Sequence, residues 1–120
     1  TRFIATPESG VVEGHRSMIP VVGADDIFAS AAMNGVPAHW MRPSVEAVGL
    51  DPKTLPAVRS PMPAGVKPWR DIWSAGQSVG LIDSVEPVAG LVARLMQELA
   101  ALPAIPDWRV RLAEISSDWA

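Results

Sequence analysis

Proline is the residue that most restricts what this chain can form. Twelve of the 120 residues are proline, double the usual frequency of roughly 5%. Five of them fall close together in the middle of the chain, at Pro52, Pro56, Pro61, Pro63 and Pro68. Each proline removes a backbone donor and clashes with a preceding helical turn, so this density excludes both a helix interior and a central strand. We therefore predict a loop here, with regular structure on either side.

Downstream of the loop, the spacing of apolar residues predicts two helices. We expect a closing helix over residues 84–101, capped by Ser84, because one apolar stripe recurs there at helical spacing: Val88, Leu91, Val92, Leu95 and Leu99. Val88, Leu91, Leu95 and Leu99 should lie on the buried face of the helix. A terminal helix is expected over residues 106–118, with an apolar face made of Trp108, Leu112, Ile115 and Trp119.

The upstream half reads as short elements joined by loops. Residues 1–6 contain the apolar run Phe3-Ile4-Ala5 and end at a turn, which predicts the remnant of a buried last strand. Thr6-Pro7-Glu8 has the form of a helix start, and Gly10 and Gly14 should weaken the helix that follows, which should end near Pro20.

Residues 24–70 are expected to form an insertion of lid-like loops, with some helix near residues 27–33. Within it, Pro43 to Gly49 predicts a short helix with proline at its start and glycine after its end. Trp69, Ile72 and Trp73 suggest one or two helical turns ending at Gly76. This inventory holds one strand, and a single strand cannot form a sheet. Either the chain is a small helical domain, or its strand belongs to a sheet supplied by residues outside this sequence.

Composition excludes several classes of function. Ten basic and 13 acidic residues give a net charge of −3, which offers no electrostatic footprint for nucleic acid or an anionic membrane. Cysteine is absent, which rules out disulfides and thiolate-bound metals. No apolar run reaches the roughly 18 residues of a membrane span, so we expect a cytoplasmic protein without a membrane segment.

Three blocks of sequence resemble one enzyme family in the same order. Thr1-Arg2-Phe3-Ile4-Ala5-Thr6-Pro7-Glu8 looks like the segment after the eighth barrel strand of the nitronate monooxygenase (2-nitropropane dioxygenase) family. Asn34 to Ala38, continuing through Arg42-Pro43-Ser44 to Pro52, is similar to a stretch downstream in many members. Ile72 to Gln77, followed by Gly80-Leu81-Ile82-Asp83, resembles the C-terminal loop of the family.

The resemblance implies an α/β fold, in which this chain is the mostly helical C-terminal portion of a flavin-binding (β/α)₈ TIM barrel. It implies an FMN-dependent enzyme that oxidises alkyl nitronates with dioxygen or reduces quinones with NAD(P)H. The chain alone is expected to be inactive and to need the upstream remainder of the barrel as its partner. A flavin-barrel enoyl reductase and a non-catalytic helical interaction module remain as alternatives.

The resemblance also implies cofactor-binding residues. Thr1 matches the position whose amide and hydroxyl meet the FMN phosphate, near the barrel rim where such enzymes bind phosphate. Ser74, Gly76 and Gln77 are the second candidates, because small residues let the backbone approach a flat ring and Gln can bond its polar edge. We expect Thr1 and the loop 74–77 to face a common hollow.

Other polar residues favour structural roles. His15 is expected to be exposed and inert, and Trp73 to pack in a core. His39 stands where the family often has Asn, which argues against a catalytic role. Asp25-Asp26 should cap a helix rather than bind a metal. We assign no catalytic residue, and the sequence contains no P-loop or dinucleotide-binding glycine motif.

Overall fold

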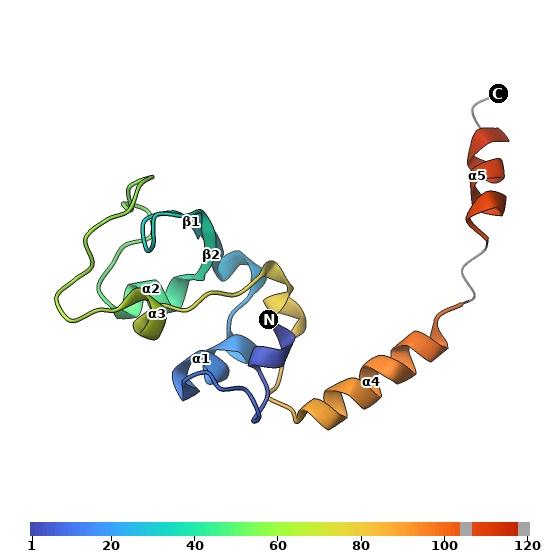
Figure 1. The fold of residues 1–120 in the computed structure, drawn as a ribbon, viewed down its shortest axis with the longest axis horizontal. Helices are drawn as coiled ribbons and strands as arrows, with labels where there is room; N and C mark the ends of the chain where they lie inside the picture. The colour runs from blue at the N-terminus through green and yellow to red at the C-terminus, as the bar shows by residue number, and fades with distance from the viewer. Residues whose placement is uncertain (104–106, 118–120) are drawn as a thin grey trace. The chain divides into compact units, whose positions relative to one another are not determined.

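The computed structural model describes residues 1–103 and 107–117 (Figure 1). The chain divides into two units, Thr1–Val88 and Ala89–Ala120. The first unit combines short helices with a small sheet, and the second is helical. The helix α4 (Val88–Ala101) begins at the last residue of the first unit.

A two-stranded sheet stands where loops and some helix were predicted. The strands β1 (Ile27–Ser30) and β2 (Ala38–Met41) pair antiparallel, with Ile27 opposite Met41 and Ser30 opposite Ala38. Gly35 closes the connection at a φ of +86°, a conformation that costs glycine little. The Trp40 indole N–H donates to the Ser30 carbonyl at 3.0 Å and ties the two strands together. The helical prediction near residues 27–33 was therefore wrong.

The predicted strand over residues 1–6 is also wrong. Arg2–Ile4 form a 3-10 turn, in which the Ile4 amide donates to the Thr1 carbonyl at 2.9 Å. The buried Thr6 hydroxyl donates to the Phe3 carbonyl at 3.0 Å. These local bonds satisfy backbone groups that a strand would have to pair with a neighbour, and no neighbouring strand pairs with this segment among the described residues.

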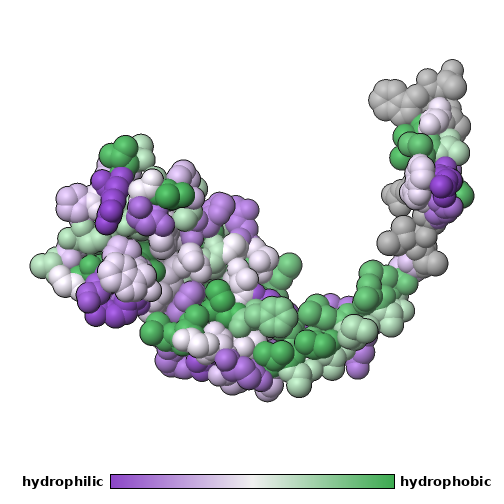
Figure 2. Space-filling view, in the orientation of Figure 1, coloured by the Kyte–Doolittle hydropathy of each residue, from purple (hydrophilic) through white to green (hydrophobic). Residues whose placement is uncertain are grey.

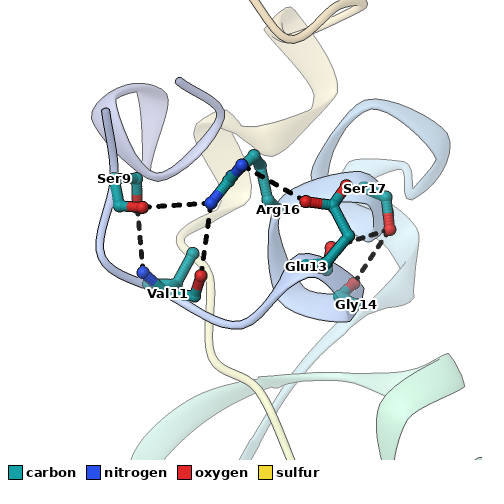
Figure 3. Close-up of polar contacts among 6 residues, drawn as sticks. All are labelled: Ser9, Val11, Glu13, Gly14, Arg16 and Ser17. Atoms are coloured by element: carbon teal, nitrogen blue, oxygen red, sulfur yellow. Dashed lines mark hydrogen bonds and ion pairs between the residues drawn. The ribbon is translucent and has the colours of Figure 1, made fainter. Parts of the chain in front are cut away.

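The helix predicted from Thr6 begins later, as α1 (Glu13–Met18), and continues into a 3-10 turn, Ile19–Val21. Figure 3 shows why residues 9–11 stay non-helical. The Arg16 guanidinium donates to the carbonyls of Ser9 at 3.1 Å and Val11 at 3.4 Å, and it pairs with Glu13 at 3.2 Å. Arg16 thus fixes the approach to α1 by bonding the backbone that precedes it.

Other short elements follow the predictions more closely. The helix α2 (Arg42–Ala47) confirms the Pro43–Gly49 prediction, and Gly49 has a φ of +81°. No helix or strand occurs between residues 48 and 67, which confirms the proline-rich loop. The helix α3 (Pro68–Asp71) ends before the predicted stop at Gly76. Two further 3-10 turns span Ala24–Asp26 and Gln77–Leu81, and the Asp26 carboxylate accepts a bond from the Gly23 amide at 2.9 Å.

The first unit holds two hydrophobic clusters, and the sheet contributes to both. One gathers residues from the N-terminal turns, the sheet and the segment after α3: Ala5, Ile19, Val22, Ile27, Met41, Ala75, Val79 and Ile82. The other lies under α2 and the proline-rich loop: Ala32, Met33, Trp40, Val45 and Ile72. Successive residues of a strand face opposite sides, so Trp40 and Met41 of β2 enter different clusters.

The helix α4 confirms the predicted closing helix, although it begins at Val88 rather than residue 84. Its first amide donates to both carboxylate oxygens of Glu8, at 3.1 and 3.2 Å, while the predicted cap Ser84 bonds Asp83 instead. Leu91 is buried, but Leu95 and Leu99 are 44% and 62% exposed, so the predicted buried face was wrong for these two residues. Figure 2 shows hydrophobic residues gathered along α4.

The helix α5 (Trp108–Ser117) confirms a terminal helix. Its apolar residues are exposed, with Trp108 at 65%, Leu112 at 55% and Ile115 at 51%. Trp119, which was expected on the same face, and the predicted ends at residues 106 and 118 lie outside the described residues. No helix in the described part of the chain combines the length and apolar character needed to cross a bilayer.

Candidate functional site

The first residue and the loop after α3 meet directly. The Gly76 amide donates to the Thr1 hydroxyl oxygen at 2.9 Å, across 75 positions of sequence. A methyl group at Gly76 would stand 3.5 Å from the same oxygen, which is an ordinary contact. The structure therefore brings together two of the segments that the sequence proposed as one site.

A second set of bonds holds the loop against the sheet. The Met41 amide donates to the Trp73 carbonyl at 2.9 Å, and Ser74 forms an isolated antiparallel bridge with Trp40. The buried Ser44 hydroxyl accepts from the Trp73 amide at 3.0 Å and donates to the Met41 carbonyl at 2.8 Å. Residues 73 and 74 therefore pair with β2 along the edge of the sheet. Ser44 links them to the start of α2.

An open hollow of about 300 Å³ lies at this junction. Residues from three parts of the chain line it: Thr1, Ile4, Ala38, His39, Ser74, Ala75 and Gly76. The expectation that Thr1 and the loop face a common hollow is confirmed for Ser74 and Gly76. Gln77 is exposed, begins the 3-10 turn Gln77–Leu81 and does not line the hollow.

His39 is a lining residue that the sequence reasoning set aside. It lies in β2 between Ala38 and Trp40, on the opposite side of the strand from the Trp40 ring. The alternation of residues 38–41 would have placed His39 on this face if the strand had been recognised. Its side chain is exposed and adds an imidazole to a hollow that otherwise offers hydroxyl groups.

His15 is not the exposed, inert residue that was expected. Its side chain is half-buried, stacks on Trp73 with ring centroids 5.8 Å apart, and places Nε2 3.1 Å from the Ser74 carbonyl oxygen. A carbonyl only accepts, so Nε2 carries the proton in this bond. Burial lowers the pKa of His15 below its usual value, and the bond to Ser74 offsets only part of this effect. His15 therefore supports the wall of the hollow from behind.

Trp73 packs as a core residue, as predicted. It lies against the first hydrophobic cluster, and its indole N–H donates to the Arg70 carbonyl at 2.8 Å. The ring passes so close to α1 that a methyl group on Gly14 would stand 2.4 Å from its Cη2 atom. Gly14, read from sequence as a weak point in a helix, is thus the residue that lets Trp73 approach.

The residues present fit one polar end of a phosphate-bearing cofactor. Thr1 and Ser74 supply hydroxyls, and no carboxylate lines the hollow. The hollow is at the lower end of ligand-pocket sizes, so it suits one end of FMN rather than the whole molecule. The Gly76 amide is already engaged with Thr1 and is not a free donor.

A metal site is not formed by the described residues, in which no group of three or more His, Cys, Asp or Glu side chains gathers. In particular, Asp26 is engaged with the Gly23 amide. The polar groups of the hollow are the hydroxyls of Thr1 and Ser74 and the imidazole of His39, and most of its remaining lining is apolar.

Comparison with known proteins finds similarity to solved structures of one enzyme. No family model matches the sequence, and a search of curated proteins finds no match. The chain is similar to FabK from Thermotoga maritima, with a TM-score of 0.54 and 26% identity over 81% of this chain and 34% of that one. A point mutant of the same FabK gives a TM-score of 0.55 and 28% identity over 82% of this chain and 31% of that one. The chain thus spans about a third of the length of these FabK chains and is similar to that part of them.

Proposed function

We propose that this chain is the C-terminal part of an FMN-dependent barrel oxidoreductase of the enoyl reductase type. FabK is a flavin-dependent barrel enzyme of the superfamily that also contains the 2-nitropropane dioxygenases. The likeness to FabK supports the enoyl reductase alternative better than the nitronate oxidation that the sequence resemblance put first. The mixed helical fold with its small sheet is consistent with a piece of such a barrel.

The bond between Thr1 and Gly76 is the observation that carries the proposal. It joins the two segments that the resemblance assigned to one cofactor, and it does so at a hollow whose lining offers donors without a carboxylate. Because the Thr1 oxygen accepts from Gly76, its own proton is free to be donated into the hollow. Thr1 would bind a phosphate oxygen in this way, and Ser74 would add a second hydroxyl.

FMN would supply the hydride-transfer chemistry when bound. The residues of this chain would bind and orient it: Thr1 and Ser74 through their hydroxyls, Gly76 by leaving room, and Gln77 from the following turn. We propose no catalytic residue among them. Residues 24–70 would lie near the mouth of the barrel, as lid-like loops that limit access of a small-molecule substrate.

The remainder of the barrel is the proposed partner of this chain. Along α4, Val92, Leu95, Met96 and Leu99 are between 44% and 62% exposed. Such a contiguous apolar stripe indicates a surface that packs against further protein. The upstream barrel would cover it.

The test uses the full-length protein and has two readouts. Thr1→Val removes the hydroxyl while keeping the side-chain shape, and we expect FMN affinity, measured by quenching of flavin fluorescence, to fall by about tenfold. The hollow is too small for the whole of FMN, so the rest of the cofactor would extend past it to the following turn, and Gln77→Ala should also weaken FMN binding. Ser78→Ala, which alters an exposed hydroxyl outside the hollow, is the control and should leave the affinity unchanged.

Activity then separates the two chemistries. We expect NAD(P)H oxidation that depends on an enoyl thioester, and little oxygen uptake with an alkyl nitronate. Nitronate-dependent oxygen uptake without enoyl reduction would restore the nitronate monooxygenase assignment. Failure of the full-length protein to bind FMN would reject the flavoenzyme proposal.

A further inference from the structure

A second cavity of the first unit lies away from the Thr1 hollow. Its volume is about 670 Å³, and it opens between the end of the β-hairpin and the proline-rich loop. The two cavities share no lining residue. Trp40 of β2 lines this cavity, whereas its neighbour His39 lines the other. This cavity therefore has no part in the proposed flavin site.

The walls of the cavity are apolar and contain two aromatic rings. Met33 and Trp40 are buried at its base, and Met62 and Val66 enter from the proline-rich loop. The Trp40 indole N–H is engaged with a backbone carbonyl, so the ring presents only apolar surface. Trp69 is 80% exposed at the edge. A tryptophan so exposed on a cavity wall is typical of a surface that gains contacts when a ligand binds.

Backbone hydrogen bonds hold the outer wall in place. The Ser60 amide donates to the Ala32 carbonyl at 2.9 Å, which fixes the loop to the end of the β-hairpin. Further along, the Arg70 guanidinium donates to the Gly65 carbonyl at 3.2 Å. The prolines restrict the loop further, because each fixes one backbone angle. A wall that is already ordered loses less entropy when a ligand binds.

The charge at the cavity is positive. Arg59 lines it and forms no ion pair or hydrogen bond with any described residue. The Lys67 ammonium lies 6.0 Å from the centre of the Trp69 ring. No acidic residue lines the cavity, and the nearby Asp71 carboxylate is engaged by Arg70 at 2.6 and 2.7 Å. An anion would find a free guanidinium here without a competing carboxylate.

We propose that this cavity binds a small amphiphilic anion with an unbranched aliphatic body. The body would lie between Met33, Met62 and Val66, where flexible methionine side chains adapt to an aliphatic chain, and Trp69 would close over it. The anionic group would pair with Arg59 at the rim. The volume falls within the range of pockets that enclose a ligand of this size. The site is distinct from the proposed flavin site, since the two cavities share no lining residue.

Calorimetry on the full-length protein tests the proposal with decanoate below its micellar concentration. We expect saturable one-to-one binding that Arg59→Gln weakens about five- to tenfold, because it removes a charge-assisted bond. Arg59 makes no hydrogen bond or ion pair with the residues that the structure describes, so this variant should fold normally. Lys53→Gln removes an exposed cation that does not line the cavity and should leave the affinity unchanged. Decanol, which lacks the charge, should bind more weakly and equally to the wild type and Arg59→Gln.

Nuclear magnetic resonance of the tryptophan side chains locates the ligand. Decanoate should shift the indole signals of Trp40 and Trp69, the latter identified by its loss in Trp69→Phe, and leave that of Trp108 in place. No saturable binding of decanoate would overturn the proposal. Equal affinity in Arg59→Gln, or shifts confined to Trp108, would also overturn it. FMN affinity should be the same in wild type and Arg59→Gln, which separates this site from the proposed flavin site.

Discussion

Replacing Gly14 with alanine sets two effects of known sign against each other. Alanine favours a helix over glycine by up to about 1 kcal/mol, and Gly14 lies in the first turn of α1, where the gain is smaller. From the helix alone, the substitution should stabilise the protein slightly. The structure predicts the opposite result.

The opposing effect is the contact with Trp73. An alanine Cβ would stand 2.4 Å from Cη2, 3.0 Å from Cζ2 and 3.3 Å from Cζ3 of the indole ring. The ring cannot move without disturbing its stack on His15 and its bond of 2.8 Å to the Arg70 carbonyl. Overpacking of this kind costs about 1–3 kcal/mol. After subtraction of the helical gain, we expect Gly14→Ala to lower the free energy of unfolding by about 1–2 kcal/mol.

Urea denaturation followed by circular dichroism measures the change. Gly90→Ala is the matched control, because Gly90 lies in the helix α4 with no atom within 4 Å of an added Cβ, and it should stabilise by up to about 1 kcal/mol. Trp73→Leu removes the indole ring and with it the overpacking at position 14. Gly14→Ala should therefore change the free energy of unfolding little in that background. If Gly14→Ala were as stable as the wild type, or if its cost persisted in the Trp73→Leu background, the packing argument would be wrong.

Three further predictions concern bonds that link distant segments. Ser44→Ala leaves the Trp73 amide without its acceptor and should cost about 1–3 kcal/mol by urea denaturation, and a loss below the error of the method would contradict this role. Glu8→Gln weakens the bond to the first amide of α4 and should lower stability by about 0.5–1 kcal/mol in thermal denaturation, whereas Ser84→Ala should have no effect; the reverse order would restore Ser84 as the cap. His15 has a lowered pKa in the folded protein, so the unfolded chain takes up the proton first as the pH falls below about 6.5. Stability should therefore decrease over that range and level off below the folded pKa, and a His15→Gln variant with an unchanged pH profile would refute the assignment.

Several elements of this protein could be predicted from local sequence. The stripe from Val88 to Leu99 predicted α4, because helical periodicity depends only on neighbours three and four positions apart. The proline-rich loop and the helix between Pro43 and Gly49 could also be predicted locally, because proline and glycine restrict or extend the backbone angles at their own positions. The resemblance to flavin barrels also placed Thr1, Ser74 and Gly76 in one neighbourhood, and the structure brings them together.

Tertiary contacts decided the rest. Strands of four residues are too short to show a clear alternation of apolar and polar residues. The pairing of β1 with β2 therefore depends on the two hydrophobic clusters to which the sheet contributes. With the strand unrecognised, His39 could not be placed in the hollow. His15 and Gly14 owe their roles to Trp73, which lies 58 and 59 residues away, and no local pattern records such a contact. Glu8 likewise replaced Ser84 at the start of α4. A cap recognised from sequence has to lie next to its helix, whereas the fold supplied a carboxylate from the other end of the unit.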